Sequence, residues 1–210
     1  MVGRVRTARQ RLAPAQRREE ILAAATRVLM TADPAMFTFE EIAAEAGVSR
    51  ALVYNYFGDK GALLAAVYTH AIAELDEQLL AALRTDRPVG PRLQAVVWHY
   101  VGFAQARQGT WQLLGHVAAT RHPIVAAARL DRIGRLAAAV EDTPLMRLTV
   151  AALVGMLEEA LTHWMAAADL SVGELSVNEL SVDDVVARLE LLVLSGVAGA
   201  LTPLLTEFAS

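Results

Sequence analysis

The chain contains no cysteine and a single lysine, Lys60, and it has only 13 glycines and 7 prolines in 210 residues. The lack of cysteine excludes disulfide frameworks, thiolate zinc sites and a cysteine nucleophile. The scarcity of glycine and proline leaves long uninterrupted windows for secondary structure. Hydrophobic residues, mostly alanine, leucine and valine, make up 55% of the chain. This composition favours helices that are held together by packing alone.

A membrane-length apolar segment is also missing. The most apolar window, Leu189 to Leu205, contains Glu190, Ser195 and Pro203, and it falls short of the roughly 20 residues that span a bilayer. We interpret it as a buried helix. The arginine-rich start of the chain differs from a secretory signal, which has an apolar core. We therefore expect a cytoplasmic protein with no membrane contact.

The two signs of charge are unevenly divided along the chain, although the net charge is only −4. Residues 1–60 hold nine Lys or Arg against seven Asp or Glu, and residues 61–210 hold ten against sixteen, giving balances of +2 and −6. A basic part joined to an acidic remainder suggests a phosphate-facing module attached to a second unit. Within the first 13 residues, a minor-groove arm or a disordered solubilising tail would both explain Arg4, Arg6, Arg9 and Arg11.

Helical spacing of apolar residues extends over almost the whole chain, and no window alternates convincingly as a strand. Residues 38–41 match a capping box, Gly47 can adopt the left-handed conformation at a helix end, and Ser49 can cap the next helix. Residues 84–91 have the composition of a polar linker. The pattern predicts an all-α fold of about nine helices, over residues 14–30, 39–46, 50–57, 60–83, 92–107, 110–119, 123–140, 144–168 and 182–208.

Three similar tetrapeptides, DLSV, ELSV and ELSV, begin at Asp169, Glu174 and Glu179. They span far less sequence than solenoid repeats, whose units usually run about 20–50 residues. We interpret residues 169–182 as an expanded loop between two helices.

The segment Arg50–Phe57 has two different faces when its residues are placed at about 100° per residue. Val53 and Phe57 share an apolar face, with Tyr56 beside them. The opposite face carries a guanidinium, a small side chain, a phenol and a carboxamide, from Arg50, Ala51, Tyr54 and Asn55. Arginine can donate to guanine, asparagine can pair with adenine, and tyrosine can reach a phosphate or a thymine methyl. This face therefore suits the major groove of DNA.

A helix, a tight glycine-containing turn and a short helix with a polar face make up the helix-turn-helix arrangement. The segment TFEEIAAEAGVSRALVYNYFGDKGALL, residues 38–64, resembles the DNA-binding signature of TetR-family transcriptional repressors. The spacing of Thr, Ile-Ala, Ala-Gly-Val-Ser, Tyr-x-Tyr-Phe and Asp-Lys-x-x-Leu matches, and the resemblance covers residues 14–80. It implies a three-helix DNA-binding domain over residues 1–60 and a larger, helical domain for effector binding and dimerisation over residues 61–210.

The resemblance also implies roles for individual residues. The helix starts at Thr38 and Ser49 would contact phosphates, helped by backbone amides, and Tyr56 and Lys60 would clamp the DNA backbone. The recognition positions would be occupied by Arg50, Ala51, Leu52, Tyr54 and Asn55. Leu52 departs from the family pattern, in which threonine is common, so we expect no polar role at that position.

The last two predicted helices carry small and aliphatic residues on a broad stripe. A single recognition helix reads few bases, so specific binding usually needs two half-sites and a symmetric dimer. Paired with their symmetry mates, these helices would form a four-helix interface, as in the family that the chain resembles. An ordinary core within one chain would also explain the stripe. The residues expected at the interface are Leu148, Ala152, Gly155, Leu192, Gly196, Gly199 and Ala200.

The middle of the chain gathers aromatic residues and histidines, including all three tryptophans. Aromatic walls with a few polar groups suit a small-molecule cavity, and the family usually has one, although most such residues are simply core. The candidate lining residues are Trp98, His99, Phe103, Trp111, His116, Met156, His163 and Trp164. The histidines lack the short spacing of a metal site, so we expect no bound metal. We expect a small-molecule effector of unknown identity and no cofactor.

Residues 60–83 would couple the effector to DNA, because this helix starts beside the recognition helix and runs back towards the cavity. A ligand that favours one tilt of the helix would change the separation of two recognition helices, which sit about 34–36 Å apart on DNA. The sequence thus predicts a ligand-responsive regulator, by family habit a repressor. It would bind a palindromic operator as a homodimer and leave it when a small, mostly apolar molecule binds.

Two other classes of function are less well supported. An enzyme would need a catalytic motif, and the chain has no G-x-S-x-G, no phosphate-cradling glycine loop and no H-E-x-x-H. We therefore expect no enzyme. The second alternative is a structural or protein-binding helical dimer without effector, in which Arg50 and Tyr54 meet an acidic protein. Steeply salt-dependent binding to palindromic duplex DNA would distinguish a regulator from such a dimer.

Overall fold

The computed structural model describes residues 13–169 and 181–207, and within these residues it contains nine helices and no strand. This architecture confirms the predicted all-α fold. The amino-terminal arginines up to residue 12 and almost all of the repeated tetrapeptides lie outside the described residues. The helices are α1 (Pro14–Leu29), α2 (Phe39–Ala46), α3 (Arg50–Phe57), α4 (Lys60–Leu83), α5 (Val89–Ala106), α6 (Gln108–Ala119), α7 (Pro123–Ala138), α8 (Pro144–Asp169) and α9 (Val182–Glu207).

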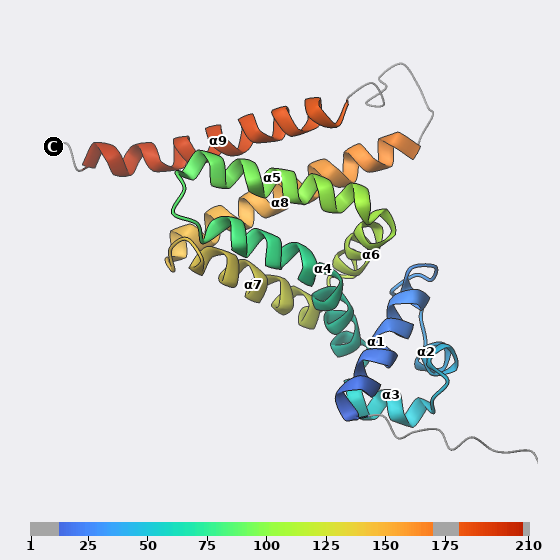
Figure 1. The fold of residues 1–210 in the computed structure, drawn as a ribbon. Coiled ribbons are helices and arrows are strands. Elements are labelled where there is room, and N and C mark those ends of the chain that lie inside the picture. The colour runs from blue at the N-terminus through green and yellow to red at the C-terminus, as the bar shows by residue number, and fades with distance from the viewer. Residues whose placement is uncertain (1–12, 170–180, 208–210) are drawn as a thin grey trace, which may run out of the picture.

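The first three helices pack together at one end of the molecule (Figure 1). At the start of α2, the Thr38 hydroxyl accepts the backbone N–H of Glu41 at 3.2 Å, and the Thr38 N–H donates to the Glu41 carboxylate at 2.7 Å. Gly47 ends α2 with a φ of 63°, in the left-handed region that glycine adopts without strain. Since α2 and α3 have only 8 residues each, they depend on these caps and on a shared core. That core includes Ile21, Ile42, Val53 and Phe57.

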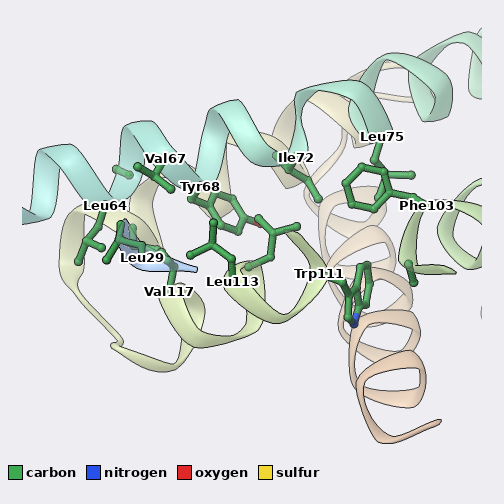
Figure 2. Close-up of a cluster of buried hydrophobic side chains, with 14 of the residues drawn as sticks. Leu29, Leu64, Val67, Tyr68, Ile72, Leu75, Phe103, Trp111, Leu113 and Val117 are labelled. Carbon is green, nitrogen blue, oxygen red and sulfur yellow. The ribbon is translucent and has the colours of Figure 1, made fainter. Parts of the chain in front are cut away.

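Helix α4 connects this amino-terminal group to the rest of the molecule. It is 24 residues long and packs against α1 and α3 as well as α5, α6 and α7. Figure 2 shows its buried side meeting residues of α6, of α5 and of the end of α1. One continuous hydrophobic cluster therefore crosses from the amino-terminal helices into the larger part. The labelled residues of this cluster are Leu29, Leu64, Val67, Tyr68, Ile72, Leu75, Phe103, Trp111, Leu113 and Val117.

Helices α4 and α7 pack side by side, α7 packs against α8, and α9 lies mainly along α5 (Figure 1). Helix α5 begins at Val89, earlier than the predicted start at residue 92 and inside the segment predicted to be a linker. Pro91 lies in the first turn of α5, where a backbone N–H has no helical acceptor, so the proline does not interrupt the helix. None of the described helices has the length and hydropathy to cross a bilayer.

A buried charged network joins four of these helices. Arg132 of α7 is 1% exposed. Its guanidinium donates to Asp76 of α4 at 2.6 Å, to Glu158 of α8 at 2.9 Å and to the Tyr100 hydroxyl of α5 at 2.8 Å. Burial raises the pKa of Tyr100, so this phenol stays neutral. Because all three partners meet one guanidinium, the network fixes how α4, α5, α7 and α8 are placed relative to one another.

Candidate nucleic-acid interface and apolar cavity

The two faces of α3 differ sharply in exposure. Val53 is 0% exposed and Phe57 is 6% exposed, so both belong to the core. Tyr54 is 43% exposed, and the side chains of Arg50, Ala51 and Asn55 are exposed as well. The polar side of α3 is therefore free to contact another molecule, while the apolar side holds the helix against α2 and α4.

Arg50 and Tyr54 are held together on this exposed face. The Arg50 guanidinium lies 5.3 Å from the centre of the Tyr54 ring, donates to its hydroxyl at 3.3 Å and pairs with Glu40 at 2.6 Å. The hydrogen bond to Tyr54 and the charge of Glu40 raise the pKa of Arg50 above its ordinary value. The Tyr54 ring in turn packs edge-on against Phe39, with centres 4.4 Å apart. Exposed ion pairs contribute little stability, so Arg50 can exchange Glu40 for a phosphate or a guanine at small cost.

Three other predicted contact residues of this region also serve the fold. The Ser49 hydroxyl caps α3 by accepting the backbone N–H of Leu52 at 3.3 Å. Leu52 and Tyr56 are half-buried and pack against the hydrophobic cluster. Leu52 therefore offers an apolar edge rather than a polar group, in keeping with its departure from the family pattern.

Thr38 and Lys60 differ in how free their polar groups are. The Thr38 hydroxyl donates to the Glu41 carboxylate at 2.9 Å while it accepts the Glu41 N–H. The Thr38 backbone N–H, and after it the Thr38 hydroxyl, donate to the Glu41 carboxylate and lower its pKa, so the carboxylate is charged at neutral pH. A phosphate contact by the Thr38 hydroxyl thus requires a change in this capping box. Lys60 is exposed at the first residue of α4, with its ammonium 4.9 Å from the centre of the Phe37 ring.

The residues predicted to form a dimer interface lie on exposed faces of α8 and α9. Leu148 is 67% exposed and Leu192 is 41% exposed, and Ala152, Gly155 and Gly196 are exposed too. A Cβ atom added at either glycine would meet nothing within 4 Å. These residues are therefore not part of the chain's own core. Gly199 and Ala200 lie in the part of α9 for which the structure does not describe side-chain exposure.

Two more leucines extend the same faces. Leu145 of α8 is 52% exposed, and Leu191 of α9 is 55% exposed. The sequence interpretation missed both, although Leu145 lies three residues before Leu148 and Leu191 is adjacent to Leu192. The helical spacing of residues 145, 148 and 152 was the available signal.

The residues predicted to line an effector cavity do not gather around one space. Phe103 and Trp111 are buried and pack in the core with ring centres 6.5 Å apart. Trp111 does border a cavity, but this cavity has a volume of only about 30 Å³. Trp98 is 49% exposed. His116 and His163 are exposed as well. The remaining predicted residues, His99, Met156 and Trp164, are half-buried. Within the described residues, no group of histidines and carboxylates could hold a metal ion.

A larger cavity, of about 470 Å³, lies between α4, α5, α7 and α8. None of the residues that the sequence predicted to line an effector cavity borders this one. Its walls are mostly aliphatic and include Leu79, Leu83, Val96, Val150, Leu153 and Leu157. The polar groups among the lining residues come from Arg92, Tyr100, Glu141, Thr143 and Thr149. This volume and lining are typical of a binding site for an apolar small molecule.

The segment that builds the exposed face of α3 matches a known family. Residues 21–67 match the family model for bacterial regulatory proteins of the tetR family. The match begins in α1, includes all of α2 and α3 and ends within α4. The chain is also 35% identical over 120 residues to the HTH-type transcriptional regulator BetI from Brucella canis. Residues 21–67 of the chain carry the domain that defines the tetR family. The matched segment includes α2, the turn and α3, which have the helix-turn-helix arrangement.

The similarity to BetI is partial. It covers 57% of this chain and 58% of the BetI sequence, so the chain spans little more than half the length of the curated relatives it matches. Among solved structures, a TetR-like regulator from Rhodococcus is 26% identical with a TM-score of 0.63, covering 90% of this chain and 100% of that one. The regulator FadR from Bacillus subtilis, solved in complex with stearoyl-CoA, is 14% identical with a TM-score of 0.57, covering 85% and 98%. The latter likeness is one of fold.

Proposed function

We propose that this TetR-family chain is a ligand-responsive repressor that binds a palindromic operator as a homodimer and leaves it when a small, mostly apolar molecule binds. The observation that carries the proposal is the outward face of α3, where Arg50, Tyr54 and Asn55 are exposed beside the small Ala51. These are the donor and acceptor types that read base edges in the major groove. The family assignment argues for a regulator rather than an enzyme.

The proposed contacts fall into two groups. Arg50, Ala51, Leu52, Tyr54 and Asn55 would face the bases, and Thr38, Ser49, Tyr56 and Lys60 would contact the phosphate backbone. Base contacts set the sequence preference, and phosphate contacts set the position on the duplex. The capping-box bonds of Thr38 make its hydroxyl the least available of these groups, whereas Lys60 is exposed.

A homodimer is proposed because one α3 helix covers few base pairs. The exposed leucines and glycines of α8 and α9 support this part of the proposal, since a lone chain leaves them in water. A symmetric pair would bury the face formed by Leu148, Ala152 and Gly155 of α8 against the face formed by Leu192 and Gly196 of α9. Residues 1–60 would then bind DNA, and residues 61–210 would provide the dimer contacts and the effector site.

The 470 Å³ cavity supports the effector part of the proposal. Leu79 and Leu83 of α4 line it, and the same helix begins at Lys60, next to α3. A ligand that prefers one position of α4 would shift the two α3 helices out of register with successive major grooves. Only the difference in ligand affinity between the two arrangements can drive this shift.

The decisive experiment is selection of bound genomic fragments by the purified protein, followed by gel-shift titration of the selected site at several salt concentrations. We expect a palindromic site and a steep loss of affinity with salt, because phosphate neutralisation releases counterions. Recovery of no preferred duplex from a protein that is dimeric by gel filtration would instead favour a protein-binding helical dimer.

A further inference from the structure

Among the described residues that line the large cavity, Arg92 is the one cation. It lies in the first part of α5 and is half-buried. Its Nη1 group donates to the backbone carbonyl of Leu83, at the end of α4, at 3.1 Å. Its Nε–H is buried and has no hydrogen-bond partner within the described part of the chain. No ion pair to Arg92 is formed there either.

A buried, unpartnered N–H on a charged group is unusual, because proteins pair nearly all of their buried polar atoms. The carboxylate of Glu141 also borders the cavity, but Glu141 is exposed and is not hydrogen-bonded to Arg92. The protein therefore holds a positive charge beside an aliphatic space without supplying an acceptor for its Nε–H. This arrangement points to an acceptor that arrives with a ligand.

The geometry of the guanidinium indicates the kind of acceptor. The bond from Nη1 to Leu83 restrains the group and leaves Nε–H, on the edge that it shares with Nη2, without a protein partner among the described residues. That edge presents two parallel donors, which match the two oxygens of a carboxylate. The aliphatic walls beyond it, such as Val96, Leu153 and Leu157, suit an alkyl body.

We propose that the effector is an amphiphilic monocarboxylate whose alkyl body fills this cavity and whose carboxylate binds the Nε and Nη2 edge of Arg92. This inference rests on the proposed effector function of the cavity. A carboxylate on Arg92 would also lie next to the last turn of α4, because Arg92 holds the Leu83 carbonyl. The head group of the ligand would thus be joined, through one side chain, to the helix that begins at the DNA-binding end.

The test compares hexanoate, decanoate and tetradecanoate with the corresponding straight-chain alcohols, by calorimetric titration of the full-length protein. We expect at least one acid to bind about tenfold or more tightly than its alcohol, because a hydrogen-bonded charge pair forms only with the acid. In Arg92→Met we expect the alcohol to bind as before and the preference for the acid to disappear. Arg87→Met is the matched control, since it removes an equal charge from the neighbouring exposed loop.

The inference about the head group would be overturned if acid and alcohol bind the unmodified protein equally. It would also be overturned if the preference for the acid persists in Arg92→Met. Neither result would contradict the proposal that the cavity binds an effector. Binding of none of these compounds, by a protein that still binds its operator, would overturn the inference and the effector function of the cavity together, but not DNA binding. If denaturation shows that the Arg92→Met protein is not folded, the titrations are made with Arg92→Lys instead. Lysine keeps the charge but not the paired donors, so we expect a weakened acid preference, and an undiminished one would contradict the proposal.

Discussion

Tyr54 links the exposed face of α3 to the core beneath it. Its ring packs on Phe39 of α2, and its hydroxyl accepts a hydrogen bond from Arg50 on the same face. A side chain that is packed on one side would lose little freedom on binding DNA, because its position is largely set beforehand. The hydroxyl and the ring therefore have separable roles, which substitution can test.

We expect Tyr54→Ala to weaken operator binding by about 1–3 kcal/mol, the usual range for loss of a specific contact to DNA. Tyr54→Phe keeps the ring on Phe39 and removes only the hydroxyl, so it separates packing from contact. Gel-shift titration gives the affinity, and gel filtration checks whether the proposed dimer persists. If Tyr54→Ala binds the operator as tightly as the unmodified protein, α3 is not the recognition helix.

Lys60 should act through its charge alone. We expect Lys60→Ala to weaken binding similarly for different DNA sequences and to reduce the salt slope by about 1, as loss of one phosphate contact does. Arg84→Ala removes an equal charge from the other end of α4, where the side chain is exposed. A salt slope that falls as much in Arg84→Ala as in Lys60→Ala would show that overall charge, not a clamp at Lys60, is responsible.

Gly61 is a point of close contact between α4 and the start of α7. A Cβ atom at this position would overlap the ring of His122, and the His122 Nδ1 atom accepts the backbone N–H of Ile124 at 3.3 Å. We expect Gly61→Ala to lower the free energy of unfolding by about 1–3 kcal/mol through overpacking. Urea denaturation of Gly61→Ala, His122→Ala and the double variant measures this effect. The double variant should lose less than the sum of the two, and strict additivity would show that the two residues do not interact.

At the level of helices, sequence signals predicted the boundaries best where a cap makes a local hydrogen bond. Thr38, Ser49 and Asp59 each accept a backbone N–H from within the first turn of the helix they precede. The start of α5 was placed too late because residues 84–91 are polar and contain proline, and nothing local shows that Pro91 falls inside a first turn. The partners of Arg132 were also unpredictable, since Asp76 and Glu158 are far from it in sequence.

The network around Arg132 gives a prediction for the packing of helices. Arg132→Met would leave Asp76, Glu158 and Tyr100 without their shared donor in a buried site. We expect a loss of about 3–5 kcal/mol in the free energy of unfolding, as when one partner of a buried pair is removed. Arg135→Met is the control, because Arg135 pairs with the same Asp76 but is half in solvent, and we expect a loss below about 1 kcal/mol. Equal losses in urea denaturation would show that the network does not hold α4 and α7 together.

For the molecule as a whole, the exposed apolar faces of α8 and α9 predict association. Leu148→Glu would place a charge in the proposed interface, so we expect a monomer in light scattering and loss of specific operator binding. Leu130→Glu is matched to it, because both leucines are 67% exposed and Leu130 lies on α7, outside the proposed interface. A dimer that survives Leu148→Glu would exclude this part of α8 from the interface.

The whole-molecule features differ in how far sequence could predict them. The helix-turn-helix follows a local pattern of caps, turns and apolar spacing, so its helices were predicted closely. The cavity is different, because it arises where α4, α5, α7 and α8 leave space among ordinary leucines and valines. The sequence prediction placed aromatic residues around the cavity instead, but Phe103 and Trp111 are buried in the core. No local pattern separates a leucine that lines a cavity from one that fills a core.

The length of α4 gives it a mechanical property. Its 24 residues make a rod of about 36 Å, with the cavity wall at one end and Lys60 at the other. If this rod pivots by about 5° near its cavity end, its far end moves by about 3 Å, as its length dictates. In such a pivot the rod would act as a lever arm, in which a small rearrangement beside a ligand would become a displacement at the DNA-binding end comparable to the length of a hydrogen bond.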